Sequence, residues 1–102
     1  MGDTPLASRK EVRIPIKLFV NLYSPENHTF EVTKTLDISC RGALVVTKNF
    51  WKLNQPLSVR AIRGNFYSRA RVVHCHRRAG SFVVGLEMYY PEGDWTAFSL
   101  VG

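Results

Sequence analysis

The chain has 102 residues, of which 45% are hydrophobic and 22% are charged, a composition typical of one globular domain. Fourteen lysines and arginines against eight aspartates and glutamates give a net charge of +6, which favours an anionic binding partner. Two cysteines cannot form a disulfide framework, and we expect neither a signal peptide nor a membrane-spanning segment. The composition therefore argues against three classes: large multi-step enzymes, membrane proteins and secreted disulfide-rich folds.

Alternating apolar residues predict two paired β-strands in the first part of the chain. The first strand covers residues 14–23 and has an apolar face: Ile14, Ile16, Leu18, Val20 and Leu22. A turn follows at residues 24–27, where serine, proline and asparagine cluster. The second strand covers residues 30–38, where the apolar residues Phe30, Val32, Leu36 and Ile38 alternate with polar ones. We expect the two strands to form a hairpin.

Four more strands follow at intervals of about ten residues. They are predicted over residues 43–47, 57–62, 66–77 and 82–90, with turns at 63–65 and 78–80 and a loop at 48–56 that buries an aromatic side chain. The last strand has an apolar face: Phe82, Val84, Leu86, Met88 and Tyr90. Helical character is limited to residues 4–12 and 92–100. The pattern predicts an all-β domain, either a small barrel or a sandwich.

The basic residues fall into two groups. One group, Arg9, Lys10 and Arg13, stands directly before the first strand. The other lies on the fourth and fifth strands: Arg60, Arg63, Arg69, Arg71, Arg77 and Arg78. Arginine forks match phosphates and guanine edges bidentately, so either group can bind an anion. The second group is equally well explained as surface charge that solvates the sheet.

A second motif, Asp37-Ile38-Ser39-Cys40-Arg41-Gly42, ends the second strand. Asp37 and Ser39 are two residues apart, so their side chains are expected on one face. A carboxylate accepts hydrogen bonds from the ring N–H and amino groups of a purine, and a hydroxyl donates and accepts. Gly42 permits a positive φ or the close approach of a ligand or strand. A bulge with an aspartate that caps a turn is the alternative interpretation.

Taken together, the two motifs resemble the PilZ domain family. Arg9-x-x-x-Arg13, followed after 23 residues by Asp37-x-Ser39-x-x-Gly42, is similar to the family's RxxxR and [D/N]xSxxG pattern. Arg13-Ile14-Pro15 resembles the family's entry into the first strand, and residues 83–88 resemble its late Val-Gly-hydrophobic run. The resemblance extends over about residues 8–91.

The resemblance implies a six-stranded antiparallel β-barrel with at most a short C-terminal helical turn. It also implies a bacterial, cytoplasmic receptor for cyclic di-GMP that has no enzymatic activity and needs no cofactor. The implied ligand-binding residues are Arg9, Lys10, Arg13, Asp37, Ser39 and Gly42. Lys10 departs from the arginine that many relatives carry there. We expect residues 1–13 to form a mobile arm that the ligand orders on the barrel of residues 14–102, which then signals to a protein partner. Neither membrane nor DNA binding is expected.

His74, Cys75 and His76, together with Cys40, raise the question of a metal site. Alternation along a strand places only the two histidines on one face, so we expect no metal there. No nucleophile elbow accompanies the serine, histidine and aspartate residues. Two rival functions stay open: a small barrel that binds single-stranded nucleic acid, and a PilZ-like scaffold that binds only protein. A flavin-binding enzyme is the least favoured, since the chain lacks a phosphate-cradling glycine loop.

Overall fold

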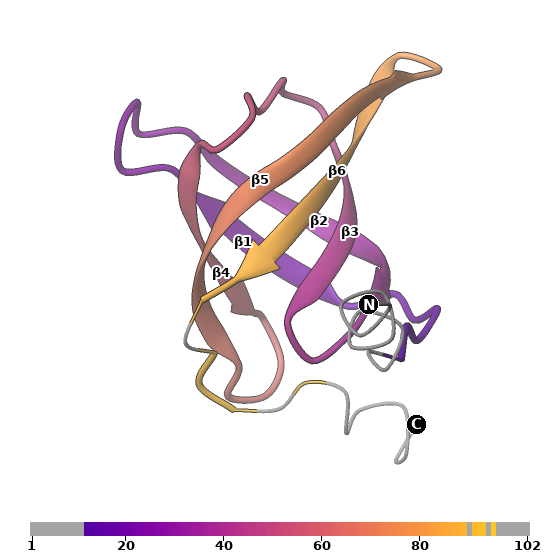
Figure 1. Ribbon diagram of the computed structural model, residues 1–102, viewed down its shortest axis with the longest axis vertical. Coiled ribbons are helices and arrows are strands. Elements are labelled where there is room, and N and C mark those ends of the chain that lie inside the picture. Colours follow the sequence, from indigo (N-terminus) through magenta and orange to yellow (C-terminus); the bar gives the residue numbers. More distant parts are fainter. Residues whose placement is uncertain (1–11, 90, 94, 96–102) are drawn as a thin grey trace, which may run out of the picture.

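The chain forms a closed β-barrel, shown in Figure 1 as a computed structural model that describes residues 12–89, 91–93 and 95. The strands are β1 (Phe19–Tyr23), β2 (Phe30–Ile38), β3 (Gly42–Thr47), β4 (Pro56–Ala61), β5 (Tyr67–Arg78) and β6 (Ser81–Met88). Their order around the barrel is β1-β2-β3-β6-β5-β4, and every neighbouring pair is antiparallel. The predicted six-stranded antiparallel barrel is confirmed, and the sandwich alternative is wrong.

The first strand is shorter than predicted, because regular pairing begins only at Phe19. Residues 14–18 are held in other ways. Ile14 and Ile38 exchange two main-chain hydrogen bonds of 2.7 and 2.9 Å. The buried hydroxyl of Thr35 donates to the carbonyl of Ile16 and accepts from the amide of Leu18, and the Thr35 amide donates to the Leu18 carbonyl at 2.9 Å. The apolar side chains of the stretch still pack against the core, as the alternation predicted.

In the first half of β2, the apolar side chains face solvent and the polar ones face the core, which is the reverse of the prediction. Phe30 and Val32 are 59% and 54% exposed, whereas Glu31 and Thr35 point into the barrel and are buried. A β-bulge between Thr35 and Asp37 then shifts the register, so that Ile38 is fully buried. A bulge changes which side chains of a strand face inward, and a simple period of two cannot anticipate it.

Glu31 occupies the barrel interior because its carboxylate is fully engaged. Its two oxygens accept hydrogen bonds from the amide of Lys48 (2.5 Å), the side-chain amide of Asn49 (3.0 Å) and the indole Nε1 of Trp51 (3.3 Å). A buried carboxylate is tolerated when hydrogen bonds replace its hydration. The prediction that the 48–56 loop buries an aromatic side chain is confirmed. That side chain is Trp51, whereas Phe50 is exposed.

The tight turns follow the predicted chemistry. Gly64 has a φ of 90° in the turn between β4 and β5, and Ala79 and Gly80 have φ values of 47° and 85° between β5 and β6. Two successive positive φ angles suit the right-handed twist of a two-residue hairpin. In the long β5–β6 hairpin, strand pairing therefore begins directly at the turn, where Arg78 lies opposite Ser81.

After β6 the chain forms a β-bridge at residue 92, and most of the predicted helical stretch 92–100 lies outside the described residues. Glu92 forms a β-bridge with Tyr67, and the two residues exchange main-chain hydrogen bonds of 3.0 and 2.7 Å. Trp95 is buried and stacks on Phe66, with ring centroids 4.1 Å apart. The other predicted helical stretch, residues 4–12, lies outside the described residues except for its last residue. Within the described part of the chain, no helix has the length and apolarity to cross a membrane.

Candidate ligand-binding site

The two sequence motifs meet at the end of β2. The double hydrogen bond between Ile14 and Ile38 brings the residues next to them together, and Arg13 Nη2 lies 2.7 Å from Asp37 Oδ1. The side chains of Arg13 and Asp37 are 56% and 23% exposed, so the pair is open to solvent. This contact uses one guanidinium nitrogen and one carboxylate oxygen, although arginine offers five N–H donors. The geometry therefore combines a carboxylate acceptor and guanidinium donors at one surface point.

Ser39 and Gly42 form the turn that follows Asp37. The amide of Ser39 donates to the carbonyl of Gly42 at 2.9 Å, and the Ser39 hydroxyl also lies within reach of that carbonyl. Ser39 is 1% exposed, so it contributes to the shape of the turn from inside. Gly42 does not use a positive φ. A Cβ there would lie 3.1 Å from the carbonyl oxygen of Leu86, so the close approach of β6 is what favours glycine.

The remaining residues of the predicted site, Arg9 and Lys10, lie outside the described residues. Arg13 is therefore the part of the RxxxR motif that the structure brings to the turn. It stands one residue before the Ile14–Ile38 bridge, at the boundary drawn between the predicted arm and the barrel.

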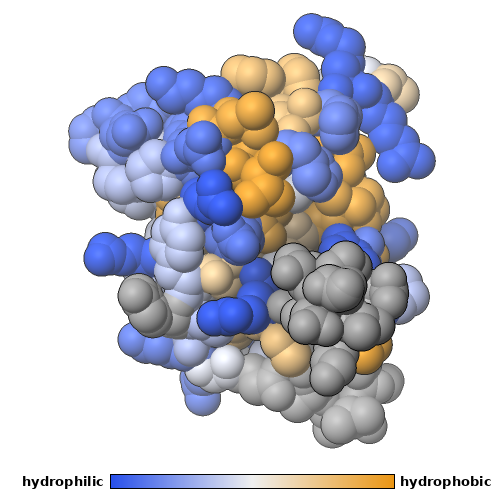
Figure 2. Space-filling model, in the orientation of Figure 1, coloured by the Kyte–Doolittle hydropathy of each residue, from blue (hydrophilic) through white to orange (hydrophobic). Residues whose placement is uncertain are grey.

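A row of outward-facing residues extends from Asp37 on β2 across β3 and β6 to β5. Register pairs Asp37 with Leu44, Leu44 with Gly85, and Gly85 with His74, so these residues share the outer face of the barrel. The absence of a side chain at Gly85 leaves room for the imidazole, because a Cβ there would lie 2.3 Å from His74 Nε2. Figure 2 shows apolar side chains at the surface where β5 and β6 face the viewer, next to hydrophilic ones.

His74 is electrostatically coupled to this site. Burial, the neighbouring His76 and the charge of Arg13 all lower the pKa of His74 below its ordinary value of 6.5. Its Nδ1 is buried, and no hydrogen-bond partner contacts it among the described residues. The lowered pKa favours the neutral form of the imidazole, whose ring borders the outward row that begins at Asp37.

The histidine pair does not form a metal centre with other residues of the described chain. The rings of His74 and His76 lie on one face, as predicted, with centroids 5.1 Å apart. Cys75 points toward the core, and Cys40 is exposed on the turn. Across the described ranges, no group of three or more histidine, cysteine, aspartate or glutamate side chains is placed to hold a metal ion.

The arginines of β4 and β5 do not act as one cluster. Arg71 forms a 2.7 Å ion pair with Glu87 and a hydrogen bond to Asn54. The guanidinium of Arg60 lies over the ring of Tyr67, 4.8 Å from its centroid, and that of Arg77 lies 5.4 Å from the Phe82 centroid. Three of the six arginines, Arg60, Arg71 and Arg77, therefore have intramolecular contacts.

Sequence reasoning missed two residues at the site. Arg41 is an exposed residue within the turn, and its carbonyl accepts a 2.7 Å hydrogen bond from the amide of Met88. A basic residue between Asp37 and Gly42 was the sequence feature that could have indicated Arg41 as a site residue. Trp95 supports the turn from the core side by donating its Nε1 hydrogen to the carbonyl of Ser39 at 2.9 Å. No local pattern indicates that contact, because it joins residues 56 positions apart.

Comparison with protein-family models gives a match to the PilZ domain over residues 7–94. No individually curated protein matches the chain. The matched range includes both sequence motifs, the six strands and the bridge at Glu92. The chain therefore belongs to the PilZ domain family.

Proposed function

We propose that this protein is a receptor for cyclic di-GMP. PilZ domains are ligand-binding and adaptor domains and are not typically enzymes, which supports a binding role. The observation that carries the proposal is the contact between Arg13 and Asp37, because it unites the two motifs at one exposed point. The ligand is a dianion with two guanines, so a guanidinium donor and a carboxylate acceptor both have counterparts on it.

Each group has a chemical counterpart on the ligand. Arginine reads the O6 and N7 edge of guanine bidentately and neutralises phosphate. A carboxylate accepts from the guanine ring N–H and amino group. In the proposed complex, Asp37 and the Ser39–Gly42 turn hold a guanine from the barrel side, and Arg13 turns its unused donors to the ligand. Arg9 and Lys10 complete the clamp from the arm, which becomes ordered as it closes.

The domain acts in this proposal as a cytoplasmic signalling module of bacteria and passes the bound state to a protein partner. It performs no chemistry on the nucleotide and requires no cofactor. The arm provides the conformational response: ligand contacts made only by the closed arm shift its population toward that state.

Calorimetric titration with cyclic di-GMP tests the proposal, with GTP and GMP as competitors. We expect saturable binding of cyclic di-GMP and little heat from the mononucleotides. Arg13→Ala should weaken binding at least about tenfold, the equivalent of about 1.4 kcal/mol. The matched control is Arg78→Ala, which removes the same charge at the exposed β5–β6 hairpin, at the other end of the barrel. Equal loss in both variants would indicate general electrostatic attraction, and no heat in the wild type would overturn the proposal.

Amide exchange with and without the ligand tests the arm. We expect residues 8–13 to gain protection when cyclic di-GMP is added, while β1 to β6 change little. Equal protection of the arm in both states would contradict the closing mechanism and would leave the binding result to stand alone.

A further inference from the structure

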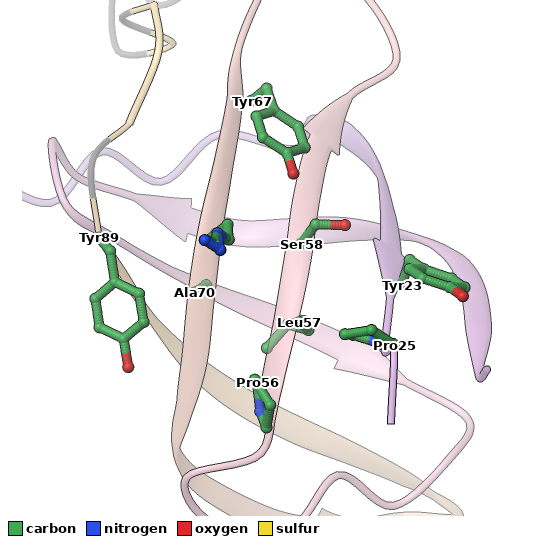
Figure 3. Close-up of a pocket in the computed structure, with 9 residues that line it drawn as sticks. Tyr23, Pro25, Pro56, Leu57, Ser58, Tyr67, Ala70 and Tyr89 are labelled. Atoms are coloured by element: carbon green, nitrogen blue, oxygen red, sulfur yellow. The ribbon is translucent and has the colours of Figure 1, made fainter. Parts of the chain in front are cut away.

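A groove lies on the wall of the barrel, and its end at Tyr89 lies next to the Asp37–Gly42 turn, because the preceding residue, Met88, is hydrogen-bonded to Arg41. It has a volume of about 490 Å³ and is formed by outward residues of β4 and β5 together with the chain that follows β1 and β6. Figure 3 shows its tyrosine rings standing around a floor that includes Ser58 and Pro56. The residues that define it are Tyr23, Pro25, Pro56, Tyr67, Arg69 and Tyr89.

Register explains why the surface is hollow. Tyr23 pairs with Ser58, and Ser58 pairs with Arg69, so a small side chain lies between two large ones on the same face. Tyr89 joins this row because its amide donates to the carbonyl of Arg69 at 2.8 Å. Tyr23 and Tyr89 are 38% and 39% exposed, so their rings form an accessible rim.

The groove is apolar in its floor and basic in its charge. Arg69 is an exposed cation of its lining, and no carboxylate belongs to that lining. Arg60, at the margin, lies over the ring of Tyr67. Among the described residues, neither arginine forms an ion pair, in contrast to Arg71, which is neutralised by Glu87. The nearest carboxylates along the chain are Glu26, beside Pro25, and Glu92, which is bridged to Tyr67.

We propose that this groove is the docking surface for an extended, acidic, proline-containing segment of a partner protein. Tyrosine-lined grooves accommodate the preformed polyproline II conformation, whose ordering costs little entropy. Carboxylates on such a segment complement the guanidinium groups of Arg69 and Arg60. A second copy of this chain is a poorer occupant, because each copy carries a net charge of +6 and would bring like charges together.

Two adjacent amides connect this groove to the ligand-binding turn. The amide of Met88 donates to the carbonyl of Arg41 inside the turn at 2.7 Å, and the next amide, of Tyr89, donates to Arg69 inside the groove at 2.8 Å. The turn and the groove are therefore bonded to adjacent peptide units of one segment. The use of the groove for signalling rests on the proposed function, whereas its ability to bind the acidic segment does not.

The probe for docking is a synthetic peptide of alternating Glu and Pro residues, about ten residues long, so that it can span the groove in an extended form. It is titrated into the isotope-labelled full chain without cyclic di-GMP, and amide chemical shifts are followed by NMR. We expect saturable shifts below about 1 mM that centre on Tyr23, Tyr67, Arg69 and Tyr89. Peptides that alternate Lys with Pro, or Glu with Ser, should produce shifts at least tenfold weaker.

Two variants locate the contact. Arg69→Glu should abolish the shifts, and the matched charge reversal Arg78→Glu should preserve them. Both variants are also titrated with cyclic di-GMP, and Arg69→Glu is expected to bind it like the wild type. This second titration separates the two proposals, because peptide binding without cyclic di-GMP binding would contradict only the proposed function.

Four results of the titrations would overturn the docking proposal. They are the absence of shifts, shifts centred outside the groove, equal binding of the Glu-Ser peptide, and tighter binding of an oligouridylate at the same residues. Concentration-dependent dimerisation that Arg69→Glu abolishes would assign the groove to a second copy and would likewise overturn it.

Discussion

The indole Nε1 of Trp95 donates a 2.9 Å hydrogen bond to the main-chain carbonyl of Ser39, inside the turn that carries the second motif. The same indole stacks on Phe66, directly before β5, with an interplanar angle of 9°. One buried side chain thus joins the turn of the second motif to the residue that precedes β5. The segment after β6 is consequently part of the site's support.

Trp95→Phe should lower the free energy of unfolding by about 1 kcal/mol, because it keeps a ring against Phe66 and leaves the Ser39 carbonyl without its donor. Trp95→Ala should cost about 3–5 kcal/mol through the cavity that it creates. Urea unfolding followed by circular dichroism measures both. If the two variants were equally destabilised, the hydrogen bond to Ser39 would be the dominant contribution and the stacking would matter little.

Gly85→Ala should destabilise the barrel by about 1–3 kcal/mol, since the new methyl group would collide with the ring of His74. His74→Ala removes that ring, so the double variant should be more stable than the sum of the single effects predicts. A double-mutant cycle in urea measures the coupling. Simple additivity would show that the imidazole moves aside at no cost.

Glu31→Ala should cost about 2–4 kcal/mol, because it leaves three hydrogen-bond donors around the barrel interior unsatisfied. Glu31→Gln keeps one carbonyl oxygen and should cost less. The control, Glu26→Ala, removes the same charge from an exposed turn and should change stability by less than about 0.5 kcal/mol. Thermal unfolding of the three variants would contradict this account if Glu26→Ala had the largest effect.

The lowered pKa of His74 predicts a loss of stability on acidification. The unfolded chain takes up a proton near the ordinary pKa of 6.5, before the folded protein does. The contribution of neutral His74 is therefore fully present above pH 6.5 and decreases as the pH falls through 6.5 toward the lower pKa of the folded state. His74→Gln should flatten this dependence between about pH 7.5 and 5.5, which urea unfolding of both proteins across that range measures.

Treatment with a chelator should leave the midpoint of thermal unfolding unchanged. His74 and His76 supply two nitrogen ligands on one face, and a structural zinc site normally requires four ligands. Differential scanning fluorimetry with and without EDTA, together with metal analysis, checks this. A large drop in the midpoint accompanied by stoichiometric zinc release would contradict the expected absence of a metal.

Local sequence determined the strands and turns of this protein. Val20 and Leu22, or Val84 and Leu86, alternate with outward residues, and this period of two suffices to predict strands that form one core. Glycines at 64 and 80 mark turns because they accept positive φ angles. The family also followed from sequence, since Arg13 and Asp37 belong to motifs whose order and spacing are specific together.

Closure of the barrel determined the side-chain orientations and contacts that depend on the register between strands distant in the sequence. It turned Glu31 inward and Val32 outward, because a bulge and three donors from the loop after β3 outweighed the local hydrophobic pattern. Closure also brought Arg13 into contact with Asp37. In the same way it placed Ser58 between Tyr23 and Arg69. Such contacts join residues far apart in the chain, and their energies depend on partners that no local window of sequence contains.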